Sequence, residues 1–178
     1  MHESSRKTAL CGILAALSAV MMFLGGLLPL ATFTAPAIAG IFLLPLALDF
    51  GTKAGLLAYV AVSLISFFIV PDREISLIFI FLLGYYPIVK ALLDKLHPRP
   101  VQWIAKVALF NAAIFSMYSI ILFLFPIRAV VEEFSDSSLL FTVGLVLLAN
   151  IAFVVYDLAL VKVRLLYYYR LRPKLLKK

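Results

Sequence analysis

TALCGILAALSAVMMFLGGLLPLATFTAPAIAGIFLLPLAL, residues 8–48, is the stretch of the chain that decides its fold. It carries no Asp, Glu, Lys or Arg over 41 residues, and about 20 apolar residues are enough for one helix to cross a bilayer. The segment 25–29 lies in the middle of the stretch and holds two glycines and a proline, which predict a break. We therefore expect two membrane-spanning helices here, over residues 7–28 and 34–50.

The composition separates this chain from water-soluble proteins. Hydrophobic residues make up 65% of its 178 residues and charged residues only 14%, whereas soluble domains are about 45–50% apolar and about 25% charged. A disordered chain is excluded as well, because disorder needs low hydrophobicity and high net charge. Four further apolar runs predict membrane spans, over residues 54–70, 74–93, 102–126 and 138–166.

Each span is expected to be an α-helix, because backbone groups in lipid have to be hydrogen-bonded within their own segment. Arg6 and Lys7 before an apolar run resemble the start of a cleaved signal peptide. The run continues into a second hydrophobic segment, however, so we expect the first helix to be retained. The predicted fold is an all-α integral membrane protein with one domain over residues 1–178, a compact bundle of six transmembrane helices.

The placement of lysine and arginine predicts the orientation of the bundle. With the N-terminus inside, only Arg73 and Arg128 of the 16 basic residues lie outside the membrane. Cytoplasmic loops carry an excess of Lys and Arg, so both termini are expected in the cytoplasm. The basic tail 167–178 is expected to leave the bilayer as a helix whose tyrosines favour the interface and whose cations favour anionic lipid. This rule explains the net charge of +7, so no nucleic-acid partner is expected.

The chain lacks the residues that membrane-embedded enzymes need. Its single cysteine, Cys11, and two histidines form no CxxC or HExxH spacing, so neither a metal site nor a cofactor is expected. A GxSxG elbow and a glycine-rich phosphate loop are also missing from the sequence. Asp72 and Glu74 are a close carboxylate pair, and capping of the following helix is sufficient to explain them. We therefore predict no catalytic residue and no enzyme.

Polar residues inside the spans are costly and therefore informative. Asn111 and Asn150 lie in the fifth and sixth spans, where asparagines bridge helices by hydrogen bonds. A proton or ion relay is the alternative, but it would need several carboxylates at mid-depth, and the spans offer none there. Asp157 is expected instead to pair with a lysine near the cytoplasmic boundary. The possible partners are Lys90, Lys106 and Lys162.

Small side chains recur at every fourth position of the first predicted helix. Four-residue spacing places each row on one stripe of a helix, where small side chains let another helix approach closely. Packing inside the bundle and a docking face for a partner both remain open. The two rows are Thr8, Gly12 and Ala16, and Cys11, Ala15 and Ala19.

Residues 8–19, TALCGILAALSA, together with six predicted helices and two cytoplasmic termini, resemble the substrate-binding S component of energy-coupling factor (ECF) transporters. The resemblance implies a subunit of a bacterial plasma membrane that captures a vitamin-like small molecule. It also implies partners, namely a transmembrane coupling subunit and two cytoplasmic ATPases. S components have no ATP site, in agreement with the missing Walker motif. The docking residues that it implies are Gly12, Ala15, Ala16 and Ala19.

The same resemblance places a ligand pocket in the outer half, covered by the loop 30–36 after the first helix. Few polar groups on apolar walls are typical of small-molecule sites. The outer cations Arg73 and Arg128 could clamp a carboxylate or phosphate of the ligand, although exposed loop charges are usually just solvated. The predicted ligand-binding residues are Thr32, Phe33, Thr34, Arg73, Glu74, Tyr118, Arg128 and Asn150.

Two other classes of function remain open. A membrane scaffold similar to the rod-shape factor MreD would have a partner face and no ligand pocket. A small membrane enzyme or lipid-handling protein would use the break at Gly84–Pro87 together with Lys90. Tyr85 and Tyr86 in that break are explained equally well by a helix kink or an interfacial aromatic belt.

Overall fold

Every regular element in the described part of the chain is helical. The computed structural model describes residues 2–123 and 139–175, and no strand occurs among them. Two compact units can be distinguished, Met1–Gln102 and Trp103–Lys178, which we call the N-terminal and the C-terminal unit.

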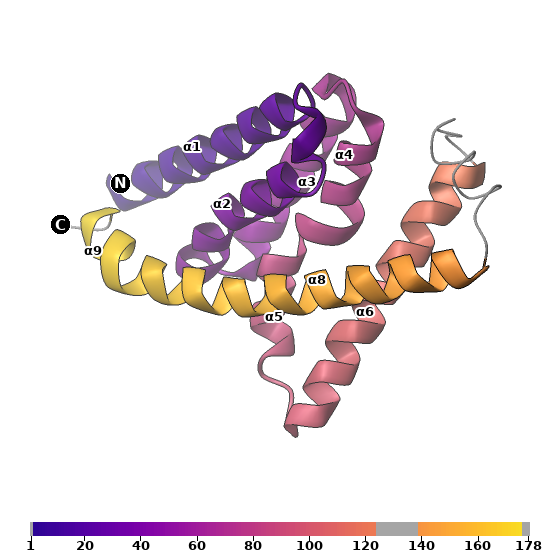
Figure 1. Cartoon of the computed structure of the whole chain (residues 1–178). Helices are drawn as coiled ribbons and strands as arrows, with labels where there is room; N and C mark the ends of the chain where they lie inside the picture. Colours follow the sequence, from indigo (N-terminus) through magenta and orange to yellow (C-terminus); the bar gives the residue numbers. More distant parts are fainter. Residues whose placement is uncertain (1, 124–138, 176–178) are drawn as a thin grey trace. The chain divides into compact units, whose positions relative to one another are not determined.

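The N-terminal unit is built from helices that lie side by side (Figure 1). The predicted break around residues 25–29 is confirmed, since the first helix ends at Gly25 and the next long one begins at Thr34. Its elements are α1 (His2–Gly25), the short η1 (Pro29–Ala31), α2 (Thr34–Phe50), α3 (Thr52–Ile69), α4 (Arg73–Ile78), η2 (Phe79–Leu83) and α5 (Tyr86–Leu93).

Glycine is required where these helices turn. Gly51 joins α2 to α3 with a φ of 92°, in the left-handed region that other residues avoid. At the opposite turn, a Cβ on Gly26 would stand 2.6 Å from Cγ1 of Val70 and 3.1 Å from Cδ of Pro71. The loop after α1 therefore touches the loop after α3.

The hydrophobic core of this unit is contributed by all of its long elements. Met22, Leu43, Val62, Phe79 and Ile88 are buried in one cluster. Apolar contacts of this kind give a membrane protein its packing, because lipid itself provides little hydrophobic drive between helices.

One polar link crosses this apolar interior. Ser18 on α1 is fully buried, and its hydroxyl donates a 2.9 Å hydrogen bond to the carbonyl oxygen of Ala39 on α2. A buried hydroxyl without such a partner would be unfavourable, so this bond holds α1 in register with α2.

The expected fourth span, 74–93, is broken rather than continuous. It consists of α4, the π-helical turn η2 and α5. The Gly84 amide donates to the carbonyl of Phe79, five residues back, at 2.8 Å. The carbonyl of Ile80, which an α-helix would have paired with Gly84, instead accepts from the hydroxyl of Tyr59 at 2.5 Å. Tyr59 of α3 thus provides a hydrogen bond to the Ile80 carbonyl, which the π-helical turn leaves without its α-helical partner.

The C-terminal unit contains two long helices. The expected span 102–126 corresponds to α6 (Arg99–Phe123), and the expected span 138–166 to α8 (Leu139–Leu166). The helix then continues as the π-helical η3 (Tyr167–Leu171) and the short α9 (Arg172–Leu175). The tail is therefore helical as far as the structure describes it, as predicted. Residues 124–138 include the expected loop between these two spans, and they lie outside the described residues.

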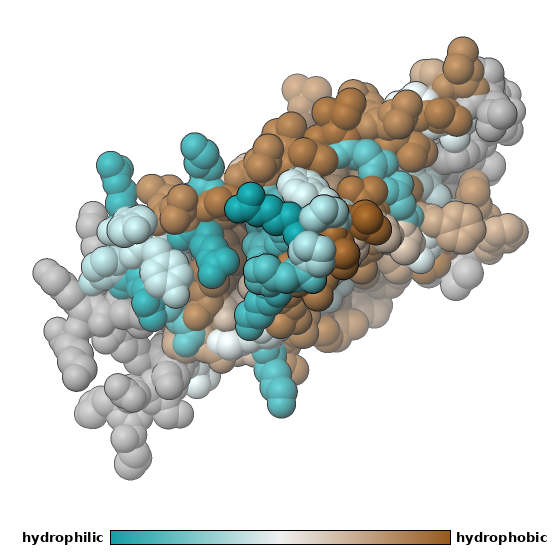
Figure 2. All heavy atoms as spheres, turned by 90° about the horizontal axis from the view of Figure 1, so that it is seen from below, coloured by the Kyte–Doolittle hydropathy of each residue, from teal (hydrophilic) through white to brown (hydrophobic). Residues whose placement is uncertain are grey.

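Five helical segments in the described residues are long and apolar enough to cross a membrane. Their outward faces are apolar too: on α3, Leu57, Leu64 and Phe68 are each more than half exposed. Apolar side chains cover much of the surface seen in Figure 2. Exposed apolar faces of this extent are typical of helices that contact lipid. The segments are Thr8–Gly25, Thr52–Ile69, Arg73–Leu93, Arg99–Phe123 and Leu140–Arg170.

Candidate functional site

The two small-residue rows of α1 lie on different faces. Ala15 and Ala19 are partly buried and pack, with Cys11, against the hydrophobic core of the N-terminal unit. Gly12 and Ala16 are exposed, and a Cβ on Gly12 would meet no atom within 4 Å. The row with Ala15 and Ala19 is therefore explained by packing inside the unit. The row with Gly12 and Ala16 leaves an open strip on α1, on which a second helix could lie.

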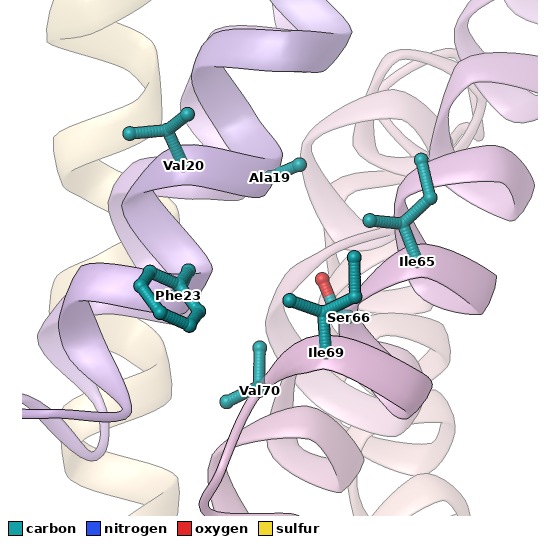
Figure 3. Close-up of a pocket in the computed structure, with 7 residues that line it drawn as sticks. All are labelled: Ala19, Val20, Phe23, Ile65, Ser66, Ile69 and Val70. Carbon is teal, nitrogen blue, oxygen red and sulfur yellow. The ribbon is translucent and has the colours of Figure 1, made fainter.

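An apolar groove runs between α1 and α3 (Figure 3). Its volume is about 220 Å³, and Ser66 provides the one hydroxyl among its lining residues. None of the predicted ligand-binding residues lines this groove, but the predicted docking residue Ala19 does. The lining residues are Ala19, Val20, Phe23, Ile65, Ser66, Ile69 and Val70.

Arg73, a predicted ligand-binding residue, contacts the end of α3. Its guanidinium donates to the carbonyl oxygen of Phe67 and stands 5.2 Å from the centre of the Phe67 ring. An arginine at the last carbonyls of a helix also interacts favourably with the helix dipole. Asp72 caps α4, as predicted, by accepting from the backbone amide of Glu74 at 2.9 Å.

The predicted ligand-binding residues fall into separate parts of the chain. Thr32, Phe33 and Thr34 stand at the start of α2, and Arg73 and Glu74 at the start of α4. The loops that lead into these two helices touch through Gly26, so the structure brings the five residues to one end of the N-terminal unit. The remaining three are Tyr118 on α6, Asn150 on α8, and Arg128, which lies outside the described residues.

A buried ion pair joins α6 to α8 in the C-terminal unit. Nζ of Lys106 stands 3.2 Å from Oδ1 of Asp157, and both side chains are only 3% exposed. The Lys106 ammonium also lies 5.1 Å from the ring centre of Trp103, one turn earlier on α6. Of the three lysines expected as partners of Asp157, the structure selects Lys106.

A reciprocal amide pair links the same two helices further along. Nδ2 of Asn111 donates to Oδ1 of Asn150 at 2.9 Å, and Nδ2 of Asn150 donates back at 3.1 Å. Each amide group also donates to the carbonyl four residues earlier on its own helix, Val107 or Val146. The prediction that these asparagines bridge helices is confirmed. Asn150 is thereby committed to a structural contact that the ligand-site interpretation did not include.

Aromatic stacking completes this set of contacts. The rings of Phe110 and Phe153 stack with centroids 4.3 Å apart and an interplanar angle of 13°. Residue numbers rise on α6 as they fall on α8, so the helices run antiparallel with one consistent register. The contacts that sequence reasoning missed here are the phenylalanine pair and the Trp103 ring. Three pairs of side chains therefore join α6 to α8, namely Lys106–Asp157, Phe110–Phe153 and Asn111–Asn150.

Replacing Asn111 with leucine should destabilise the chain by about 0.6–1.7 kcal/mol, the range measured for hydrogen bonds between membrane helices. The cause is the loss of both amide hydrogen bonds with Asn150. Unfolding in mixed micelles with increasing dodecyl sulfate measures the difference. Asn111→Leu/Asn150→Leu should be less destabilised than the sum of the two single variants, because the double variant leaves no amide without its partner on the other helix. Additive losses would mean that the amides act independently.

A second buried lysine lies at the end of α5. Lys90 pairs with Asp94 at 3.3 Å, and the same carboxylate oxygen accepts from the amide of Gln102 at 3.1 Å. Because Lys90 has a carboxylate one turn away, the pair explains its burial without a catalytic role. Across the described residues, no group of three or more His, Cys, Asp or Glu stands close enough to hold a metal ion.

Comparisons of this chain with protein-family models, with curated proteins and with solved structures give no match. The function of the chain is therefore inferred from its sequence pattern and from the geometry of its side chains.

Proposed function

We propose that this chain is a substrate-capture subunit of an ECF-type uptake transporter in a bacterial plasma membrane. It binds a vitamin-like small molecule from outside and docks on a transmembrane coupling subunit that carries two ATPases. In this proposal the chain crosses the membrane six times and has both termini in the cytoplasm. ATP hydrolysis is a property of the partners.

The number and length of the apolar helices support the six-span part of the proposal. Five segments are long enough to cross. The apolar helix α2 adds a further 17 residues, about 26 Å of helix at 1.5 Å per residue. That length is at the lower limit for a span. Much of α2 is buried by its neighbours, including Ala35, Ala39 and Leu43. A short helix enclosed by longer ones needs little contact with lipid.

The observation that carries the docking part is the open strip on α1. Gly12 and Ala16 are exposed, while the neighbouring Ala15 packs inward. Lipid tolerates any apolar side chain, so it gives no reason for glycine and alanine at outward positions. Close approach of another helix does give a reason, because small residues let two backbones come near.

Gly12→Leu/Ala16→Leu should weaken assembly with the coupling subunit and ATPases by about 1–3 kcal/mol, the usual cost of extra side-chain volume in a packed contact. The measurement is the fraction of the chain that co-purifies with these partners after co-expression of all four proteins. The isolated variant should unfold at the same temperature as the unaltered chain or at a higher one, because nothing lies within 4 Å of a Cβ at Gly12 and leucine favours the helical state over glycine.

Ala108→Leu/Ala112→Leu is the matched control, since both alanines are exposed on α6 at the same four-residue spacing. This control should assemble normally. Equal assembly by both double variants would show that the α1 strip contacts only lipid.

A scaffold protein is the second candidate, and the engagement of two predicted site residues favours it. Arg73 contacts the end of α3, and Asn150 pairs with Asn111. If Arg73 and Asn150 serve only these structural contacts, the chain needs a partner face but no ligand pocket. Native mass spectrometry of the purified chain separates the two candidates, because only a capture subunit should retain a small molecule.

A further inference from the structure

The groove between α1 and α3 is apolar except for one buried hydroxyl. Ser66 is 1% exposed, and no group in the described part of the chain forms a hydrogen bond with its Oγ. In Figure 3 this oxygen points from α3 into the groove. A serine in a helix can donate to the carbonyl four residues earlier, here that of Val62, but Ser66 does not. Because an unpaired hydroxyl in apolar surroundings is unfavourable, its place at the groove needs a reason.

The backbone of Ser66 is held by two hydrogen bonds, so its hydroxyl is presented at a fixed place. The Ser66 carbonyl oxygen accepts from the hydroxyl of Ser76 on α4 at 3.1 Å and from the amide of Val70 at 3.0 Å. Val70 in turn lies against the loop after α1, where a Cβ on Gly26 would stand 2.6 Å from its Cγ1. The two loops therefore close one end of the groove, and Ser66 lies one helical turn away from that end.

The walls of the groove continue into the outward faces of the two helices. Val20 on α1 and Ile65 and Ile69 on α3 line the groove, and each is about half exposed. In the proposed membrane topology these side chains contact lipid, so a ligand reaches the groove from the hydrocarbon phase. An apolar cavity of about 150 Å³ holds the six carbons of benzene, so the groove, at about 220 Å³, accommodates about nine non-hydrogen atoms.

We propose that the groove binds a neutral, largely apolar small molecule with one hydrogen-bond acceptor, to which the Ser66 hydroxyl donates. The inference deepens the proposed function, on which it rests for the role of this molecule as the captured substrate. No cation stands among the lining residues, and a charge buried without a partner is costly. The substrate class is therefore neutral rather than anionic.

The hydroxyl, and not the apolar wall, gives the groove its preference for such a ligand. Lipid tails are as apolar as leucine, so apolar walls alone favour a hydrocarbon ligand little over the lipid itself. An acceptor dissolved among lipid tails has no hydrogen-bond partner there, and it gains one at Ser66. Lipid tails carry no acceptor and leave the hydroxyl unpaired.

Nuclear magnetic resonance of the full-length chain in phosphatidylcholine nanodiscs, with labelled isoleucine δ1 methyl groups, tests the inference. The probe is 2-octanone, a ketone that matches the groove in size, and n-nonane is an alkane of the same size without an acceptor. The ketone should shift the methyl signals of Ile65 and Ile69 until they saturate, whereas the alkane should give no saturable shift. Ile104 on α6, which is 68% exposed, should respond only in proportion to the ketone dissolved in the bilayer.

Substitutions of Ser66 test the role of its hydroxyl. Ser66→Ala should weaken 2-octanone binding by about 2- to 12-fold, the range that corresponds to one neutral hydrogen bond. Ser66→Cys keeps a weak donor and should give an intermediate affinity. Ser63→Ala is the matched control, because Ser63 is also buried on α3 but is not among the lining residues of the groove. This control should leave the affinity unchanged.

The stability of Ser66→Ala separates a ligand site from a structural role. The substitution deletes a buried hydroxyl that has no partner among the described residues. The empty variant should therefore unfold at the same dodecyl sulfate concentration as the unaltered chain or at a higher one. A hydroxyl that served packing alone would instead lower the stability of the chain when removed.

Three results would overturn the proposal. They are equal effects of 2-octanone and n-nonane on Ile65 and Ile69, an unchanged affinity of Ser66→Ala for the ketone, and no ketone response together with signals that differ between ester-linked and ether-linked phosphatidylcholine. The last result would identify a lipid ester carbonyl as the occupant. Assembly with the coupling subunit and ATPases reports on the proposed function: assembly without ketone binding contradicts the groove alone, and ketone binding without assembly contradicts the transporter alone.

Discussion

Lys106→Met should lower the free energy of unfolding of the chain by about 3–5 kcal/mol, the usual loss when one partner of a buried ion pair is removed. The substitution keeps the unbranched stem of the side chain and deletes its charge. Asp157 is then left buried, at 3% exposure, without the ammonium that stood 3.2 Å from its Oδ1. Reversible unfolding in mixed micelles, followed by helix content, measures the change.

The double variant Lys106→Met/Asp157→Leu separates the loss of the Lys106 ammonium beside the buried Asp157 carboxylate from the loss of packing. Replacing both members of a buried pair by apolar residues of similar volume is often neutral or stabilising, so this variant should recover most of the loss. Lys53→Met serves as the control, because Lys53 is exposed in the first turn of α3 and should change stability by at most about 0.5 kcal/mol. If Lys106→Met is as mild as Lys53→Met, the ion pair is not a source of stability.

Glycine and proline made the first helices predictable from the sequence. The segment 25–29 separates α1 from α2, and Gly51 separates α2 from α3, so the expected helix 34–50 matches the observed Thr34–Phe50. These residues act locally, through their own backbone preferences. Their effect is therefore visible without knowledge of the packing.

The break at Gly84–Pro87 is visible in the sequence of the fourth span. The π-helical turn before it could not be predicted, because its causes lie on other helices. Residues 77–83 are an unbroken apolar run, and nothing in that run indicates a π-helical turn. The turn depends on Tyr59 of α3, which satisfies the Ile80 carbonyl, and on Gly40 of α2, which lets the backbone of Leu83 approach. Both contacts join residues more than 20 positions apart.

The candidate site shows the same division between spacing and packing. Four-residue spacing identified both small-residue rows of α1, but only the positions of α2 and α3 decide that Ala15 turns inward and Gly12 outward. Asn111 and Asn150 were recognised as a bridge because polar groups in lipid have few alternatives. The partner of Asp157 was undecided among three lysines, since the choice depends on which helix lies beside α8.

Gly40→Ala should destabilise the chain by about 1–3 kcal/mol, the usual cost of adding volume to a packed core. A Cβ at this position would stand 2.5 Å from the carbonyl oxygen of Leu83 and 3.4 Å from Cα of Gly84. Both neighbours are backbone atoms of the broken fourth span, so they cannot move aside by changing rotamer. The added methyl group must push α2 away from η2.

Gly12→Ala is the matched control, and the expected effect has the opposite sign. Alanine favours the helical state over glycine by about 0.5–1 kcal/mol, and a Cβ at Gly12 meets no atom within 4 Å. The same unfolding titration should therefore show Gly12→Ala unchanged or stabilised, and Gly40→Ala destabilised. The hydrogen bond from Tyr59 to Ile80 supplies a second readout. If Gly40→Ala separates η2 from its neighbours, this bond is already weakened in that variant. Tyr59→Phe should then lower the free energy of unfolding less in Gly40→Ala than in the unaltered chain. Stabilisation by both alanine substitutions would mean that α2 and the broken span are not in close contact, and that the π-helical turn has another cause.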